Sequence, residues 1–167
     1  MSIDPPGEPA EGGAARRDGP GVIAPPPLVF VAGLAIGFGL EALLPSASVP
    51  NAVAWPVGTV LLVAGGALVA SFFAAFRRAR TPVDVARTTT AIVTTGPYRF
   101  SRNPAYLALA LIYAGIAVLT GALWPFVTLV PTLVVIDLGV IRREERYLED
   151  RFGQEYLRFK ARTRRWI

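Results

Sequence analysis

The chain has 167 residues, of which 53% are hydrophobic and only 17% are charged, and its mean hydropathy of +0.46 is high for a soluble domain. This composition indicates a membrane protein. Because the sequence contains neither cysteine nor histidine, it excludes disulfides, thiol nucleophiles, imidazole bases and zinc sites built from those residues. We therefore expect no metal site. We also expect no nucleic acid partner, since membrane topology explains the positive charge.

The order of polar and apolar segments predicts one membrane domain behind a short tail. Residues 1–27 hold seven of the fifteen prolines and little that can be buried, which predicts a disordered cytoplasmic tail. The predicted membrane domain covers residues 28–167. Four apolar runs in it predict transmembrane helices, over residues 28–44, 55–76, 105–120 and 122–141. The first two are each long enough to cross about 30 Å of hydrocarbon as a helix. The last two are separated only by Gly121 and predict a tight helical hairpin. The predicted fold class is an all-α integral membrane protein with four transmembrane helices and a cytoplasmic amphipathic helix over residues 142–162.

The positions of the basic residues test this topology. In a four-span arrangement all 17 lysines and arginines fall on one side, and the two loops on the other side carry no charge. The positive-inside rule then predicts a multi-pass protein of the cell membrane with both termini cytoplasmic. A cleavable signal peptide is the alternative for the first run, because SAS at 46–48 resembles a cleavage site, but that run is long and starts late.

Glycines recur inside the first two apolar runs, at positions 33, 37, 58, 65 and 66. Such small residues let helices approach each other closely. We expect them to serve packing within one bundle rather than a dimer interface, and the sequence leaves the oligomeric state open.

The segment 94–107 is the most polar part of the chain next to an apolar run, and it contains TGPYRFSRNPAY. Asn103 precedes a proline, which disfavours helical geometry, while Pro104 suits the first position of a helix. The amide groups at such a helix start favour anions, and Arg99 and Arg102 add positive charge. The segment therefore suits a carboxylate or a phosphate. Ordinary juxtamembrane arginines that bind anionic lipid are the alternative.

A second polar cluster closes the fourth run. Asp137 precedes Glu144 by seven residues, so two α-helical turns predict that both carboxylates share one face, with Glu145 adjacent. An acidic residue within a membrane span usually faces a polar cavity, although Asp137 is close enough to the membrane edge to reach the surface instead. Beyond it, the amphipathic helix is expected to bend near Gly153 and either to cap a pocket or to pack on the surface.

Two motifs in this order resemble a known family. GPYRFSRNPAY at 96–106, a helical hairpin, and EERYLEDRFGQEYLRFKARTRRW at 144–166 are similar to the integral membrane methyltransferases grouped around isoprenylcysteine carboxyl methyltransferase and the phospholipid N-methyltransferases. The resemblance implies a cytoplasm-facing site for S-adenosyl-L-methionine and a lipidic or amphiphilic methyl acceptor that enters from the bilayer, with membrane lipids as partners. The implied cofactor-binding residues are Tyr98, Arg99, Arg102, Asn103, Pro104, Tyr106, Leu107, Glu144 and Glu145. Isoprenylcysteine enzymes usually carry histidine where this chain has Asn103, so a proton-transfer role at that position is in doubt.

Methyl transfer from a sulfonium fits a chain without histidine or cysteine, because the protein mainly has to align donor and acceptor and to exclude water. For a carboxylate acceptor, Arg165 or Arg99 is the candidate that orients it. For an amine acceptor, a proton must leave, and Glu145 or Asp137 is the candidate base. The sequence leaves both acceptors open.

Two other functions remain as alternatives. A sterol-reductase-like membrane oxidoreductase that uses NADPH also has an arginine-x-proline-x-tyrosine stretch before its last spans, but its C-terminal pattern differs. A non-catalytic membrane scaffold would keep the fold without the chemistry. The retained polar residues of both motifs argue against this scaffold.

Overall fold

The computed structural model describes residues 21–46, 49–79 and 92–167. Within these ranges the chain is helical and has no strand, apart from one isolated parallel bridge between Ser101 and Arg164. The helical elements are α1 (Pro26–Leu43), α2 (Asn51–Ala79), the 3-10 turn η1 (Gly96–Arg99), α3 (Pro104–Thr120), α4 (Leu123–Ile136), the π-helical turn η2 (Asp137–Ile141), α5 (Arg142–Phe152) and α6 (Gln154–Arg162). The predicted all-α class is thus confirmed for the described residues.

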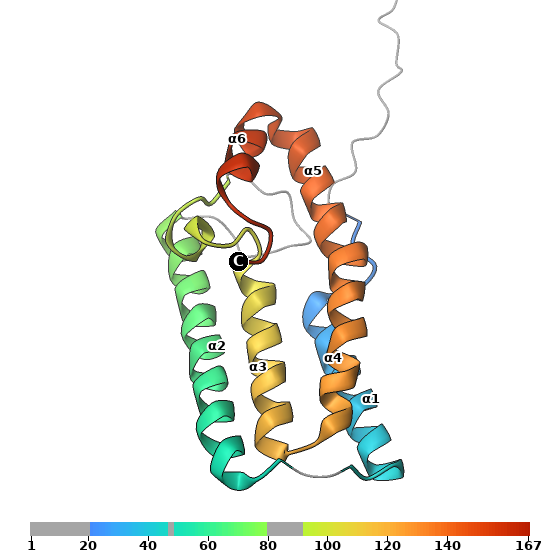
Figure 1. Ribbon diagram of the computed structural model, residues 1–167. Coiled ribbons are helices and arrows are strands. Elements are labelled where there is room, and N and C mark those ends of the chain that lie inside the picture. The colour runs from blue at the N-terminus through green and yellow to red at the C-terminus, as the bar shows by residue number, and fades with distance from the viewer. Residues whose placement is uncertain (1–20, 47–48, 80–91) are drawn as a thin grey trace, which may run out of the picture.

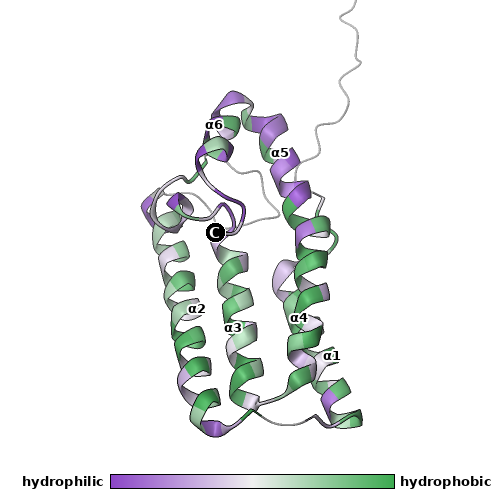
Figure 2. Ribbon diagram, in the orientation of Figure 1, coloured by the Kyte–Doolittle hydropathy of each residue, from purple (hydrophilic) through white to green (hydrophobic). Residues whose placement is uncertain are grey.

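Helices α1 to α4 form a bundle in which α2 packs on α3 and α1 packs on α4 (Figure 1). Helix α4 continues through η2 into α5, which leaves the bundle, and α6 folds back over the end of the bundle where α3 starts. Figure 2 shows that α1 to α4 are mostly hydrophobic, whereas α5 and α6 are mostly hydrophilic. We call this polar part the α5–α6 end of the bundle.

Three helical stretches are long and apolar enough to cross a membrane, namely Pro26–Leu43, Asn51–Arg78 and Leu123–Phe152. Helix α3 is apolar but has only 17 residues. The third stretch exceeds the predicted 122–141 because α4, η2 and α5 follow one another without a break. Three of the four predicted spans therefore correspond to helices of full spanning length.

Four glycines of the first two helices, Gly33, Gly37, Gly58 and Gly65, lie where helices touch. A Cβ atom on Gly33 would come 2.1 Å from Oγ1 of Thr132, and one on Gly37 would come 2.6 Å from the Cα atom of Pro125. On the other side of the bundle, a Cβ atom on Gly58 or Gly65 would collide with α3. For these four glycines the predicted packing within one bundle is confirmed; at Gly66 a Cβ atom would meet nothing within 4 Å.

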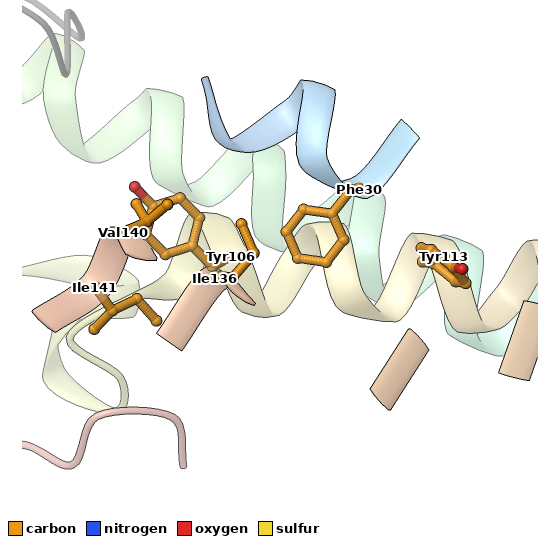
Figure 3. Packing of buried hydrophobic residues seen from close by; sticks show 6 residues of the cluster. All are labelled: Phe30, Tyr106, Tyr113, Ile136, Val140 and Ile141. Atoms are coloured by element: carbon orange, nitrogen blue, oxygen red, sulfur yellow. The ribbon is translucent and has the colours of Figure 1, made fainter. Parts of the chain in front are cut away.

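The buried core connects the bundle to the α5–α6 end. It gathers side chains from α1, α3, α4 and η2 (Figure 3), which are Phe30, Tyr106, Tyr113, Ile136, Val140 and Ile141. Partly buried apolar side chains pack around it, among them Trp166 near the C-terminus. This packing fixes the start of α3 and the turn η2 relative to each other, and both carry predicted site residues.

The predicted tail lies mostly outside the described residues, but residues 21–27 belong to the fold. The carbonyl of Gly21 accepts a hydrogen bond of 2.9 Å from Nη1 of Arg143, and Ile23 packs so closely on Gly139 that a Cβ atom there would come 2.4 Å from Ile23 Cδ1. Helix α1 begins at Pro26. Residues 21–27 therefore do not belong to a disordered tail, because Ile23 packs on η2, Gly21 is bound by Arg143 and residues 26 and 27 are part of α1.

Candidate functional site

The polar segment before α3 adopts the geometry that its turn residues predict. Gly96 has φ +62°, a left-handed conformation that favours glycine, and it opens the 3-10 turn η1. Asn103 has φ −126° and ψ 54°, outside helical geometry, and Pro104 is the first residue of α3. The carbonyl of Asn103 accepts the hydrogen bond of Leu107 N at 3.0 Å. The segment therefore ends in an ordered helix start, with Asn103 and Pro104 buried.

The C-terminal residues bind along this segment, more than sixty positions later in the chain. Arg102 N donates to the carbonyl of Arg164 at 2.9 Å. The carbonyl of Arg165 accepts from Asn103 Nδ2 at 3.0 Å and from Ser101 Oγ at 3.3 Å. Asn103 thus uses its side-chain amide to hold the C-terminal residues.

Four of the predicted site residues form one ion-pair network. Glu145 Oε1 lies 3.1 Å from Arg102 Nη1, and both side chains are buried, at 7% and 10% exposure. Arg165 binds the same carboxylate through two nitrogens, Nε at 3.1 Å and Nη2 at 2.8 Å. Its third nitrogen, Nη1, donates to Asp137 at 3.3 Å, and Asp137 also accepts from the exposed Arg142 at 3.1 Å. Buried charges need such pairing, because an unpaired charge would be strongly destabilising.

Glu144 points elsewhere and accepts a hydrogen bond of 2.7 Å from the hydroxyl of Tyr106. Among the described residues it has no guanidinium partner. The expectation that Asp137 and Glu144 share a face is wrong, because Asp137 shares Arg165 with Glu145 instead. The π-helical turn η2 is the reason: its i to i+5 hydrogen bonding takes up one residue more than an α-helical turn, which brings Glu145 onto the face of Asp137.

Two tyrosines lie beside the glutamates, Tyr98 near Glu144 and Tyr156 near Glu145. Tyr98 packs its ring against Phe72 and Phe76 of α2, and burial, together with the charge of Glu144, raises its pKa well above the usual range. Burial raises the pKa of Tyr156 in α6 to about 12, with Glu145 adding to the effect. Both phenols therefore stay neutral hydrogen-bonding groups at physiological pH.

Two residues have buried polar atoms without a hydrogen-bond partner in the described structure. They are Arg102, at Nε and Nη1, and Tyr147, at its hydroxyl. Nη1 of Arg102 is close enough to Glu145 for an ion pair but is not aligned for a hydrogen bond. Sequence reasoning missed Tyr147; its only signal is that it follows Glu144 by three positions, which places it one turn further along α5. Buried donors without partners are uncommon and call for a ligand or water.

Not every predicted residue reaches the network. Arg99 is exposed at the end of η1, and Leu107 is half-buried one turn into α3. Glu41 lies at the opposite end of the bundle, where its carboxylate accepts hydrogen bonds from Ser46 and from the backbone of Trp124. There it caps the start of α4.

Comparison with known proteins gives two matches. The phospholipid methyltransferase family matches residues 53–155, which contain most of the motif residues but not Arg165. An uncharacterized protein of Haemophilus influenzae is 39% identical over 62 residues, which cover 37% of this chain and 98% of that protein. No solved structure is significantly similar.

Proposed function

The chain belongs to the phospholipid methyltransferase family, as the two sequence motifs indicated, and we propose that it transfers a methyl group from S-adenosyl-L-methionine to a lipidic or amphiphilic acceptor at the membrane surface. The family supports methyl transfer in general. The observation that supports the cofactor is a buried guanidinium, Arg102, whose Nε has no hydrogen-bond partner. The carboxylate of Glu144, next in sequence to the Arg102 partner Glu145, has no guanidinium partner among the described residues.

Arg102 and Glu144 fit the amino-acid part of the cofactor, which carries one carboxylate and one ammonium group. Arg102 would bind the carboxylate through Nε, and Glu144 would bind the ammonium group. The hydroxyl of Tyr147 is a further donor without a partner. Tyr98 and Tyr106, with the neighbouring Asn103, Pro104 and Leu107, would form the wall on the α3 side. Glu145 would act by holding Arg102 rather than by touching the cofactor.

The bound cofactor supplies an electrophilic methyl group, and the protein's part is to align the acceptor with it and to exclude water. The location supports a lipidic acceptor, because these residues lie where the apolar bundle meets its polar end (Figure 2). An acceptor with an apolar tail would keep that tail along α2, α3 or α4 while its polar head reaches the site.

The ion pairs reduce the number of residues that could orient a carboxylate acceptor or take a proton from an amine acceptor. Arg165 uses all three of its nitrogens on Glu145 and Asp137, so orienting a carboxylate acceptor would fall to Arg99. Glu145 and Asp137 are both held in ion pairs with arginines, so their oxygens face guanidinium groups of the protein rather than an acceptor. For an amine acceptor, Glu144 is therefore the better proton acceptor. It is the carboxylate bound by a neutral phenol.

We further propose that all four helices cross the membrane with the α5–α6 end in the cytoplasm. Helix α3 rises about 26 Å at 1.5 Å per residue, slightly less than the hydrocarbon thickness. Its packing along α2 supports a crossing despite this length (Figure 1). The basic residues of the chain favour the cytoplasm for that end.

The first test is calorimetric titration of the full-length protein in detergent with S-adenosylhomocysteine, the product that the cofactor leaves behind. NADPH serves as the control ligand for the oxidoreductase alternative. We expect binding of S-adenosylhomocysteine alone. Binding of NADPH alone would assign the protein to the reductases, and binding of neither would favour the non-catalytic scaffold.

Two variants test whether Arg102 belongs to the cofactor site. Arg102→Ala should abolish measurable binding of S-adenosylhomocysteine, because it removes the guanidinium that is proposed to bind the carboxylate of the ligand. Arg158→Ala removes an exposed arginine from α6 and should leave the affinity unchanged. Equal affinity of the two variants for S-adenosylhomocysteine would refute the assignment of Arg102 to the site. The methyltransferase activity would then still be tested separately, with radiolabelled methyl donor and total membrane lipid.

A further inference from the structure

The C-terminal residues Thr163–Ile167 lie outside the region that the family covers, yet they touch both halves of the proposed site. On the α3 side, the backbone of Arg164 and Arg165 binds three consecutive residues, 101–103. On the other side, the Arg165 side chain reaches Asp137 in η2 and Glu145 in α5. Figure 1 shows the end of the chain returning to the start of α3.

We infer that Thr163–Ile167 is a strap that completes the site, and that Arg165 is a positioning residue that holds Glu145 in place against Arg102. The inference rests on the proposed function, since it concerns the site for the methyl donor. The strap is anchored at both ends: Thr163 is buried, and Trp166 packs against the core cluster. Arg165 therefore cannot swing freely between alternative partners.

The geometry explains why a second arginine is needed. Glu145 is bound by Arg102 through a single ion pair that lacks hydrogen-bond alignment, whereas Arg165 grips both carboxylate oxygens. A bidentate guanidinium fixes the plane of a carboxylate, which a single contact does not do. The hydrogen bonds with Glu145 also raise the pKa of Arg165, so its charge is constant. With Glu145 fixed in this way, Arg102 keeps its Nε free for a ligand.

A positioning role for Arg165 replaces the direct role that the sequence suggested, which was to orient a carboxylate acceptor. A residue that binds the acceptor should keep donors open toward the site, but each nitrogen of Arg165 faces a carboxylate of the protein. Its effect on the ligand must therefore pass through Glu145 and Arg102.

The test compares Arg165→Ala with Arg162→Ala, which removes an exposed arginine three positions earlier, at the end of α6. Both are full-length proteins purified in detergent and titrated with S-adenosylhomocysteine. We expect Arg165→Ala to weaken binding about tenfold or more and Arg162→Ala to change it less than about twofold. Arg165→Lys keeps the charge but not the bidentate grip, so its affinity should lie between those of Arg165→Ala and the unmodified protein.

A double-mutant cycle separates positioning from a general structural role. In a Glu145→Gln background, Arg165→Ala should have little further effect on the dissociation constant, because its path of action has already been removed. Additive losses would overturn the positioning role. If Arg165→Ala is aggregated after purification, Arg165→Lys carries the same cycle. Equal affinities of Arg165→Ala and Arg162→Ala would overturn this inference alone, whereas no binding by the unmodified protein would overturn the proposed function and this inference with it.

Discussion

Replacing Glu145 by alanine should destabilise the protein strongly, because it removes the anion that two guanidinium groups share. The carboxylate is 7% exposed, and its partner Arg102 is 10% exposed, so little water can replace it. Removing one partner of a buried ion pair costs about 3–5 kcal/mol, mostly because the remaining charge stays buried without compensation. For a chain of this size that corresponds to a fall in Tm on the order of 10 °C.

Thermal unfolding in detergent, followed by tryptophan fluorescence, measures this effect. Asp150→Ala is the matched control, since Asp150 is an exposed acidic residue of the same helix, and a change there should stay within about 0.5 kcal/mol. Glu145→Gln keeps the shape and one acceptor oxygen and should fall between the two. If Glu145→Ala melts at the temperature of Asp150→Ala, the network is not buried and the reasoning is refuted.

Three further predictions concern single groups. Tyr106→Phe removes the donor to Glu144, so calorimetry should show binding of S-adenosylhomocysteine weakened about tenfold; unchanged affinity would contradict a role for this pair. Gly37→Ala places a methyl group 2.6 Å from the Cα atom of Pro125 and should lower the free energy of unfolding by about 1–3 kcal/mol. Gly39→Ala is the control, because a Cβ atom there meets nothing within 4 Å. Equal Tm values of the two variants would argue against the α1–α4 contact. Burial raises the pKa of Tyr156 from 10.0 to about 12, so its contribution to stability is complete below pH 10 and is lost toward pH 12. Tyr156→Phe should therefore lose less stability over that range in a pH series of melting curves, and identical alkaline losses would refute the assignment.

Much of the fold was predictable because hydropathy and turn chemistry are local signals. Apolar runs of membrane length predicted the helices, and the proline at position 104 predicted the start of α3. The small residues predicted close helix contacts, since a missing side chain has the same consequence in any bundle. Hydropathy did not predict that Ile23 would pack on η2, because proline and glycine are frequent in the segment around it.

The arrangement inside the site was less predictable, because it depends on contacts between distant parts of the chain. The expected shared face of Asp137 and Glu144 assumed a regular α-helix, and nothing in the sequence DLGVI signals the π-helical turn that the structure contains. The pairing of Arg165 with Glu145 joins positions twenty residues apart across a helix break at Gly153. Local sequence patterns identify the charged residues of such a network, but they do not show which of these residues form ion pairs with each other.

The π-helical turn and Arg165 together decide which of two adjacent glutamates is paired with an arginine of the described structure. In a regular α-helix, Asp137 and Glu144 would share a face, and an arginine between them would neutralise Glu144. The additional residue in η2 brings Glu145 to Arg165 instead and leaves Glu144 to a neutral phenol. Within the part of the chain that the structure describes, Glu144 has no guanidinium partner, and a carboxylate in that situation near a membrane is costly and usually functional. The helix irregularity is therefore best understood as part of the site, because it separates a glutamate that supports Arg102 from a glutamate that can receive a cation.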